Sequence, residues 1–353
     1  MSDQRATSVD RQGDGARLLK AAARQRSVAL ADLFLPEPFR LNDWQRATVR
    51  FLLERLVRTV EDDLRATLAE TFADEEAAAA ALSSAQVEIA QPLLDRSAAL
   101  QDPELVGVLL RRAEEHRLYR AGAPNAAEAL LRELIRDRDE GVAAEAMAVL
   151  VGTSRRLDRF LEPVTARTEL SADLQHRLVW TVAAALRLYL TEQHGIEASR
   201  ADEAIAAAAA AILGPYDEGD TLEARAVRLA RRLDQAGRLD DSLIARFAAE
   251  GSLPLLLAAL AARTGFAYAC LWEIVSAPGG RGAALLVRAA GLGREEAAAI
   301  LLRLAGPSVP EDLIAAQIDL FDGLDTEQAI RGLRVWTLDP AYRAAVIRLG
   351  EAA

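Results

Sequence analysis

The feature that most constrains the fold of this chain is a repeated order of capping residue, short helical run and proline or glycine break. The stretch Ser84–Leu105 (SAQVEIAQPLLDRSAALQDPEL) has all of these parts. We expect Ser84 to cap a helix that is kinked at Pro92. Asp102 and Pro103 should begin the next helix, because proline is favoured at the first helical position. Short helices punctuated in this way are typical of stacked helix pairs.

The composition favours helices along the whole chain. Hydrophobic residues make up 51% of the 353 residues but aromatic residues only 5%, so the core must consist mainly of Ala, Leu and Val. Alanine is the best helix former, and the residues that favour strands are sparse. We therefore predict an all-α protein of about 18 helices, HEAT-like helix pairs combined with helical bundle regions.

The first third of the chain contains one long apolar stripe. Residues 1–15 are polar and are predicted to be a disordered tail, followed by a helix over residues 16–33. From Asn42 to Phe72 apolar residues recur at steps of three and four, which predicts one long helix or two helices broken near Glu61. The charged residues of this run fall largely between the apolar positions: Glu54, Arg58, Glu61, Asp62 and Arg65.

A loose internal repeat supports the helix-pair prediction. After a helix that ends in an Arg/Asp-rich turn, Val142, Ala144 and Val149 correspond to Val87, Ile89 and Leu94 at one constant offset. Two copies do not establish a repeat length, since a reliable repeat needs three or more copies.

Caps and breaks continue to the end of the chain. We expect a left-handed helix end at Gly195 and helix starts at Ser171, at Ser199 with Asp202, and at Asp339; capping boxes should lie at Asn125 with Glu128, Ser308 with Glu311, and Asp325 with Gln328. Glu162-Pro163 ends the first half, so we predict two helical domains, residues 16–165 and 166–353.

Charge and cysteine content exclude several classes of protein. A net charge of −11 argues against a general nucleic-acid or anionic-membrane surface. The single cysteine, Cys270, excludes an intramolecular disulfide and a cysteine-rich zinc site. The N-terminus lacks an apolar signal-peptide core, and the longest apolar runs are too short to span a bilayer. We expect a cytoplasmic protein.

Several segments resemble one bacterial family. They are LADLFL, VEIAQPLLDRSAALQDPEL, LSADLQHRLVWTVAAALRLYL, and IARFAAEGSLPLLLAALAARTGF running into GAALLVRAAGL. Together they are similar to the family catalogued as domain of unknown function 2336 over most of residues 28–305. The resemblance implies an all-α, repeat-like protein with a role in bacterial signalling. It implies no catalytic residue.

The presence of only one lysine argues against several classes of nucleotide-dependent enzyme. Among 42 Lys and Arg residues only Lys20 is a lysine, and no Gly-Lys-Ser/Thr triplet exists. A Walker-type phosphate loop therefore has no counterpart here, and Lys20 has no kinase-like or Schiff-base setting. We predict no cofactor.

His176 carries the sharpest hypothesis of a reactive site. The sequence LQHRLVWTVAAALRLYL resembles the phosphoacceptor helix of some histidine kinases, although Trp180 stands where those kinases carry asparagine. A phosphotransfer protein without its own ATP site is one interpretation, and a helix-surface histidine is the other. His116 and His194 fit ordinary helix positions, and the three histidines form no metal-ligand pattern.

The segment Gly279, Gly280, Arg281 and Gly282 has two interpretations. Free backbone N–H groups and Arg281 at a helix start can hold an anion. A tight turn between two helices explains the same glycines. A related choice arises for Cys270, which we expect to be a buried core residue and not a catalytic thiol. The pairs Arg111-Arg112, Arg155-Arg156 and Arg231-Arg232 should be solvated helix faces, each able to bind an acidic partner.

These patterns favour a non-enzymatic scaffold or adaptor that binds another protein, in bacterial signal transduction. The alternative is phosphotransfer through His176. A small apolar ligand between helices is a third interpretation, and the oligomeric state stays open.

Overall fold

The structure is a computed structural model that describes residues 40–351, except residues 98, 123–125 and 308. Some predictions lie outside the described residues: the tail at residues 1–15, the helix over residues 16–33, and the capping residues Asn125 and Ser308.

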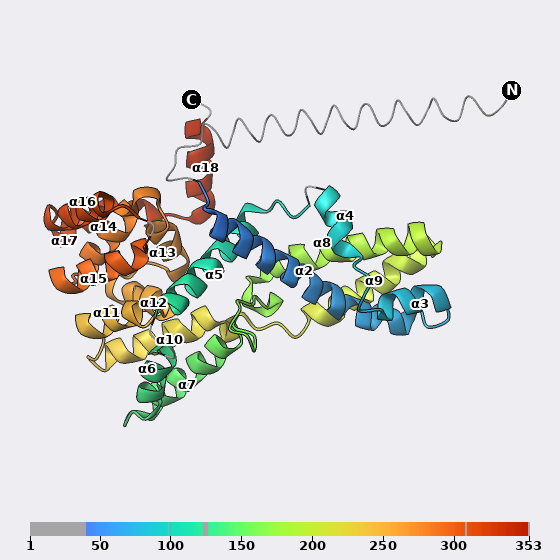
Figure 1. The fold of residues 1–353 in the computed structure, drawn as a ribbon, viewed down its shortest axis with the longest axis horizontal. Helices are drawn as coiled ribbons and strands as arrows, with labels where there is room; N and C mark the ends of the chain where they lie inside the picture. The colour runs from blue at the N-terminus through green and yellow to red at the C-terminus, as the bar shows by residue number, and fades with distance from the viewer. Residues whose placement is uncertain (1–39, 98, 123–125, 308, 352–353) are drawn as a thin grey trace. The chain divides into compact units, whose positions relative to one another are not determined.

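The described part of the chain contains 17 α-helices and no strand, which confirms the all-α prediction (Figure 1). Its one β-type pairing is an isolated antiparallel bridge between Leu157 and Pro163. The helices are α2 (Asp43–Thr71), α3 (Glu76–Ser83), α4 (Ala90–Arg96), α5 (Pro103–Ala121), α6 (Ala126–Ile135), α7 (Glu140–Ser154), α8 (Ala172–His194), α9 (Ala198–Leu213), α10 (Leu222–Gln235), α11 (Asp241–Ala249), α12 (Leu253–Thr264), α13 (Tyr268–Val275), α14 (Arg281–Ala289), α15 (Arg294–Ala305), α16 (Glu311–Asp322), α17 (Thr326–Gly332) and α18 (Pro340–Glu351). Short 3₁₀ helices are η2 (Arg167–Glu169), η3 (Glu218–Asp220), η4 (Pro278–Gly280) and η5 (Arg334–Thr337).

Most predicted helix ends are confirmed. Asp102 accepts hydrogen bonds from the backbone N–H groups of Glu104 and Leu105, with Pro103 at the first position of α5. Ser171 caps α8, and Gly195 ends it in the left-handed region with φ 64°. Asp325 and Gln328 form the expected capping box of α17. Local sequence is enough at these ends because each cap lies within five residues of the groups it satisfies.

Ser84 does not cap a helix; it follows the last residue of α3. The cause is a buried ion pair on the single long helix α2, where Glu61 and Arg65 lie 3.0 Å apart. Arg65 donates hydrogen bonds to the carbonyl oxygens that end α3 and continue beyond it, those of Ala81, Leu82, Ser84 and Val87. Glu61 accepts from the backbone N–H groups of Ile89 and Ala90, where α4 begins. Both ends are therefore capped from another helix.

Two other local predictions are also wrong. Pro92 lies in the first turn of α4, where no intrahelical N–H bond is lost and no kink is needed. Glu197, rather than Ser199 or Asp202, caps α9, because its carboxylate accepts the N–H of Arg200 at 3.0 Å.

The repeat-like arrangement is not confirmed. Val142 and Ala144 lie in α7, whereas Val87 and Ile89 lie in the non-helical segment before α4. Burial differs as well, since Val142 is buried and Val87 exposed. The chain also packs helices that are distant in sequence, such as α11 with α15, whereas a solenoid repeat contacts only its neighbours.

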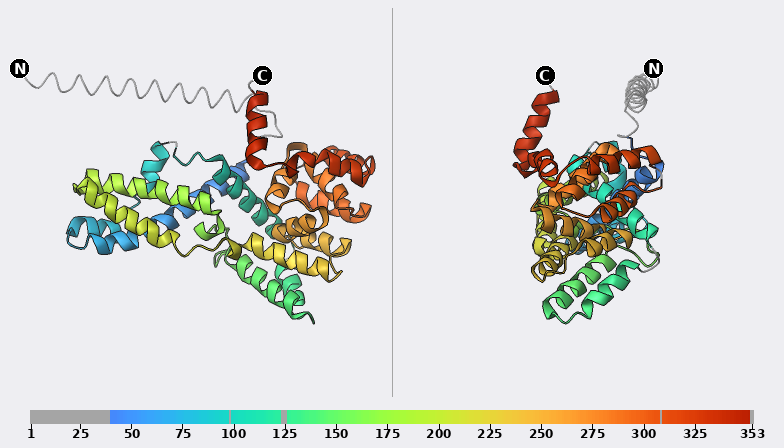
Figure 2. Two further views of the ribbon diagram at one scale, coloured as in Figure 1. Left: turned by 180° about the vertical axis from the view of Figure 1, so that it is seen from behind. Right: turned by 90° about the vertical axis from the view of Figure 1, so that its left-hand side faces the viewer.

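Residues 44–353 form one unit that holds two hydrophobic cores. The first core is made by α2, α3, α4, the start of α5, α8 and α9; the second by the end of α5, α6, α7 and the helices from α10 to α17 (Figure 2). Both cores combine segments from before and after residue 165. The predicted domain boundary at residue 165 stays a prediction. The two cores do not divide the chain at that residue.

Candidate interaction site

A cluster of buried charges lies where the two cores meet along the chain. On α5, Arg112 and Glu115 stand between Leu109 of the first core and Leu118 of the second. Glu169 adjoins Leu170 of the first core, and Glu223 adjoins Leu222 of the second. The charged side chains therefore occupy the junction between two apolar regions.

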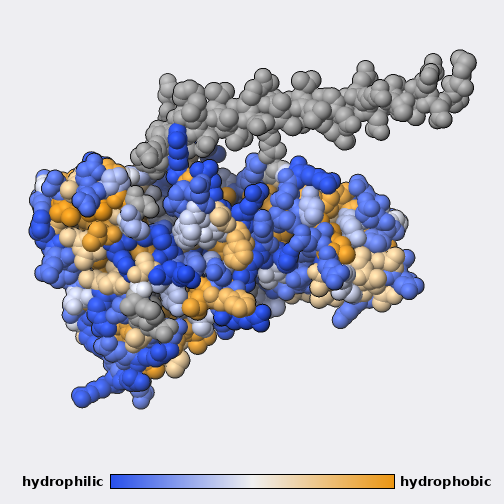
Figure 3. Space-filling view, viewed as in Figure 1, coloured by the Kyte–Doolittle hydropathy of each residue, from blue (hydrophilic) through white to orange (hydrophobic). Residues whose placement is uncertain are grey.

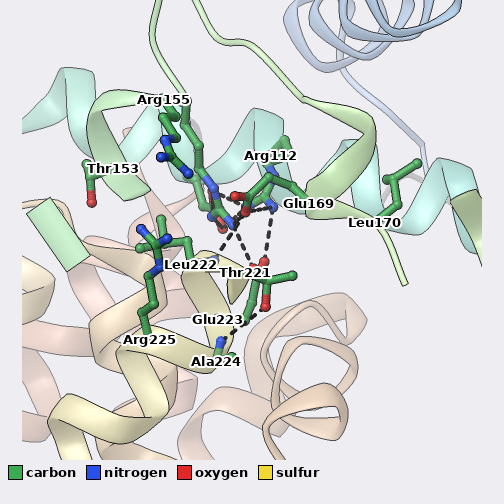
Figure 4. Close-up of polar contacts among 12 residues, drawn as sticks. Arg112, Thr153, Arg155, Glu169, Leu170, Thr221, Leu222, Glu223, Ala224 and Arg225 are labelled. Carbon is green, nitrogen blue, oxygen red and sulfur yellow. Dashed lines mark hydrogen bonds and ion pairs between the residues drawn. The ribbon is translucent and has the colours of Figure 1, made fainter. Parts of the chain in front are cut away.

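Arg156, in the loop after α7, is the centre of this cluster. Its Nη1 donates to both oxygens of Glu115, at 3.1 and 2.9 Å. Its Nη2 donates to Glu169 and Glu223, each at 2.6 Å. One guanidinium thus joins carboxylates from α5, η2 and α10. Figure 4 shows Glu169 and Glu223 close to Arg112, which also belongs to the cluster.

Two further guanidinium groups balance the charge. Arg112 Nη1 donates to both oxygens of Glu115, at 2.9 and 2.8 Å, and its Nη2 lies 3.1 Å from Glu223. Arg111 Nη2 donates to Glu223 at 2.8 Å. Three arginines face three glutamates, so the cluster carries no net charge and each buried ion has a partner.

The ion pairs of the cluster keep its side chains ionised. Burial alone raises the pKa of Glu223, but the guanidinium groups of Arg112, Arg156 and Arg111 outweigh it and hold this pKa well below its usual range. Burial lowers the pKa of Arg156, and its carboxylate partners raise it above the ordinary value. Glu223 therefore stays ionised at neutral pH and is a structural charge, not a general acid.

The solvated-face prediction for the arginine pairs is partly wrong. Arg111, Arg112 and Arg156 are in the cluster, whereas Arg155 is 58% exposed and Arg231 and Arg232 are exposed. The missed signal is spacing. Arg112 follows Leu105 and Leu109 at steps of four and three, which places it on the buried stripe of α5.

Arg156 also begins a tightly bonded loop, residues 157–163, which we call the 157–163 loop. Val164 N donates to Arg156 O at 2.8 Å, and Asp158 N donates to Glu162 O at 3.0 Å. The Asp158 carboxylate accepts the N–H groups of Phe160 and Glu162, at 2.8 and 3.0 Å. These hydrogen bonds link the loop to itself, and the Leu157–Pro163 bridge closes its base.

Side chains of two helices attach this loop to the body of the protein. Arg55 on α2 donates to Asp158 at 2.8 Å, and this hydrogen bond lowers the pKa of Asp158, which stays ionised at neutral pH. His116 Nε2 on α5 lies 3.1 Å from the carbonyl oxygen of Leu161 and donates to it. Burial lowers the pKa of His116, so the neutral ring is favoured.

The tip of the loop presents apolar side chains to solvent. Phe160 is 67% exposed and Leu161 48%. Leu161 has φ 62°, and it is the one non-glycine residue with positive φ among residues that the structure describes. The left-handed region costs an L-residue about 1–2 kcal/mol. A strained and half-exposed leucine is unfavourable for folding alone, and such outliers cluster at functional sites.

A cavity of about 50 Å³ lies between the loop and the charge cluster. Its lining includes Leu157 and Pro163 from the loop and Arg112, Glu115 and Arg156 from the cluster. Sites for small-molecule ligands have volumes of about 300–1,000 Å³. This cavity is too small for a ligand of that class, and most of its surface is apolar.

His176 is exposed on α8, as the helix-surface interpretation expects. The indole N–H of Trp180 donates to His176 Nε2 at 3.0 Å, so the lone pair of that nitrogen is engaged. A phosphoryl group would have to displace this bond to react at Nε2. Phosphotransfer through His176 stays a prediction.

Packing accounts for the glycines at residues 279–282. A Cβ at Gly282 would lie 1.9 Å from the carbonyl oxygen of Ile274, and one at Gly280 would meet the side chain of Gln317. Gly279 and Gly280 have φ of 76° and 70°, which side chains rarely adopt. The turn between α13 and α14 thus requires these glycines, and an anion beside Arg281 stays a prediction.

Cys270 is buried, as predicted, and burial raises the pKa of its thiol. Within the described ranges no group of three or more His, Cys, Asp or Glu side chains is placed to hold a metal ion. No single described helix is long and apolar enough to cross a membrane. Helices α12 and α13 have the required length and apolar character only when they are taken together, and the pair is bent by 109°. Residues Leu253–Leu260 of α12 are buried in the protein, most of them in the second core.

Comparison with known proteins identifies the family. No curated protein and no solved structure matches the chain. The profile of the bacterial family described as "uncharacterised protein conserved in bacteria" (DUF2336) matches residues 89–334. This range includes the charge cluster and the 157–163 loop, and it covers well over half of the chain. The protein belongs to the DUF2336 family.

Proposed function

We propose that the protein is a non-enzymatic interaction module that binds another protein through the 157–163 loop. The observation that carries this proposal is Leu161, a half-exposed leucine in the left-handed region at the tip of a rigid loop. A rigid apolar side chain that is already exposed loses little conformational entropy on binding. A part in bacterial signal transduction stays a prediction of the family resemblance.

A photo-crosslinking amino acid at position 160 of the full-length protein tests the proposal in the living bacterium. The matched control is position 302 on α15, where Leu302 is 59% exposed. We expect a discrete crosslinked band from position 160 that is absent from position 302. The Leu161→Gly substitution, which keeps the backbone of the loop, should remove the band. Equal labelling from both positions, or none from position 160, would contradict the proposal.

Phosphotransfer through His176 is the alternative from the sequence, and a separate measurement decides it. The purified protein is incubated with bacterial kinases and response regulators and assayed for acid-labile phosphate. Label in the wild type that is lost in His176→Ala would favour phosphotransfer, and the interaction module predicts no such label.

A further inference from the structure

Exposed apolar side chains alone do not set the 157–163 loop apart from the rest of the surface. Large exposed apolar residues also occur on helices such as α2, α7 and α18. Figure 3 shows hydrophobic side chains in small separate groups on a largely hydrophilic face. The loop is distinguished instead by the way in which its strained residue, Leu161, is held.

His116 on α5 bonds the tip of the loop. Its Nε2 lies 3.1 Å from the carbonyl oxygen of Leu161. A carbonyl oxygen only accepts hydrogen bonds, so Nε2 carries the proton of the neutral ring and Nδ1 carries none. Nδ1 is buried and has no hydrogen-bond partner among the described residues. The ring therefore holds Leu161 through one nitrogen and buries the other nitrogen without a proton.

The surroundings of Nδ1 are unsuited to a second proton. His116 lines the cavity between the loop and the charge cluster, and most of the surface of this cavity is apolar. Glu115 lines it too, but both of its carboxylate oxygens already accept from Arg112 and Arg156. Burial raises the pKa of Tyr119, the other titratable group in the lining, which stays neutral. The lining residues from α6, α10 and α12 are apolar: Leu131, Leu222 and Pro254.

Burial is the largest influence on His116 and lowers its pKa below the ordinary value of 6.5. Two charges outside the cavity act in opposite directions, because Glu162 on the loop favours the protonated ring and Arg120 on α5 disfavours it. Asp158, the other carboxylate of the loop, is engaged by Arg55. The neutral ring is therefore the form that holds the loop at neutral pH.

We propose that His116 is a pH-sensitive switch: its neutral ring holds the tip of the 157–163 loop, and protonation of Nδ1 at mildly acidic pH releases it. A charged N–H that is buried without an acceptor is costly, so the protonated ring turns toward water and its bond to Leu161 breaks. Leu161 then loses a contact that keeps it in the left-handed region, and the strained backbone relaxes.

The sign of the pH dependence follows from the direction of the pKa shift. The released ring is in water and has an ordinary pKa, whereas the pKa of the ring that holds the loop is lower. The bond to Leu161 is therefore at full strength above about pH 6.5 and weakens as the pH falls below that value. Control of partner binding by this switch rests on the proposed function, but release of the loop does not.

Fluorine NMR of the full-length protein measures the release directly. 4-Trifluoromethylphenylalanine replaces Phe160, next to Leu161, and a second sample carries the same probe at position 302 on α15 as the matched control. Both samples are titrated from about pH 7.5 to about pH 5, the range in which histidine changes its charge. We expect the resonance from position 160 to shift as the pH falls below about 6.5, and the resonance from position 302 to stay in place.

Two variants assign the shift to His116. An amide at this position can donate to the carbonyl of Leu161 but does not titrate, so His116→Gln should keep the resonance of the held loop down to about pH 5. His116→Ala lacks the bond at every pH and should show the resonance of the released loop already at neutral pH. The other two histidines, His176 and His194, are unchanged in both variants.

The inference is contradicted by a resonance from position 160 that does not respond to pH, or by one that shifts equally in His116→Gln. A matching shift at position 302 also contradicts it, because the change would then be global unfolding and not release of the loop. No partner is present in these samples, so such results leave the proposed interaction module in place. Absence of the crosslink from position 160 would instead remove the interaction module and leave the switch.

Discussion

At the scale of single residues, sequence neighbours in this protein have opposite environments. Arg155 is exposed, with one long ion pair of 3.8 Å to an exposed Asp220, while Arg156 joins three buried carboxylates. Removing one partner of a buried ion pair is costly because the other charge stays buried without compensation. Exposed pairs contribute little.

Arg156→Ala should lower the free energy of unfolding by about 3–5 kcal/mol, since Glu115, Glu169 and Glu223 lose their common partner. Arg155→Ala, its neighbour and control, should stay within about 0.5 kcal/mol of the wild type. Urea denaturation at neutral pH measures both. Similar losses in the two variants would show that the cluster is not a stabilising unit.

The lowered pKa of Glu223 gives a pH dependence with a defined sign. Its folded-state pKa lies below the ordinary value of 4.5, so the stability it contributes is present above that value and is lost as pH falls toward the lowered pKa. Glu223→Gln should therefore be less stable at pH 7, and the gap to the wild type should narrow from about pH 5 to pH 3. A difference in unfolding free energy between Glu223→Gln and the wild type that stays constant from pH 5 to pH 3 would refute the assignment.

At the scale of elements, the packing of α13 against α14 requires glycine at position 282, whereas the packing of α5 does not require glycine at position 107. A Cβ on Gly282 would lie 1.9 Å from the carbonyl oxygen of Ile274, which is backbone and cannot rotate away. A Cβ on Gly107, inside α5, meets nothing within 4 Å. The same substitution therefore has opposite expected effects.

Gly282→Ala should destabilise the protein by about 1–3 kcal/mol, because α13 and α14 are forced apart. Gly107→Ala should raise stability by about 0.5–1 kcal/mol, since alanine is the better residue inside a helix. Thermal unfolding of the two variants beside the wild type tests this, and a shift in the same direction for both would contradict the assigned packing.

The elements also show what sequence can and cannot predict. Asp102, Ser171 and Asp325 were predictable caps because the groups they satisfy are two or three residues away. Ser84 was not, since Glu61 and Arg65 on another helix satisfy the backbone around it. Long-range contacts of this kind leave only a weak sequence signal, a charged residue at a buried stripe position.

The candidate site was less accessible to sequence than the fold. Glu162-Pro163 indicated a break, but nothing in the sequence around Leu161 requires a left-handed leucine. Arg55 and His116 are distant in sequence from the loop residues that they bond, so their convergence on the 157–163 loop appears only in the structure. His176 and the segment Gly279–Gly282 were recognisable as patterns, and their predicted roles are untested.

At the scale of the whole molecule, two cores built from interleaved segments share one charge cluster, and the 157–163 loop directly follows the central residue of that cluster, Arg156. The tip of this loop destabilises the folded state, because Leu161 has a strained backbone and a half-exposed side chain. The central claim is that Leu161 serves binding and not folding. The free energy of unfolding of Leu161→Gly tests it without any knowledge of the partner.

Glycine relieves the left-handed strain of about 1–2 kcal/mol and adds about 0.5–1 kcal/mol of backbone entropy to the unfolded chain. Leu161→Gly should therefore be as stable as the wild type, or more stable by up to about 1 kcal/mol, in urea denaturation at neutral pH. A loss of more than about 1 kcal/mol would contradict the account, because it would make Leu161 part of the folded structure's own packing.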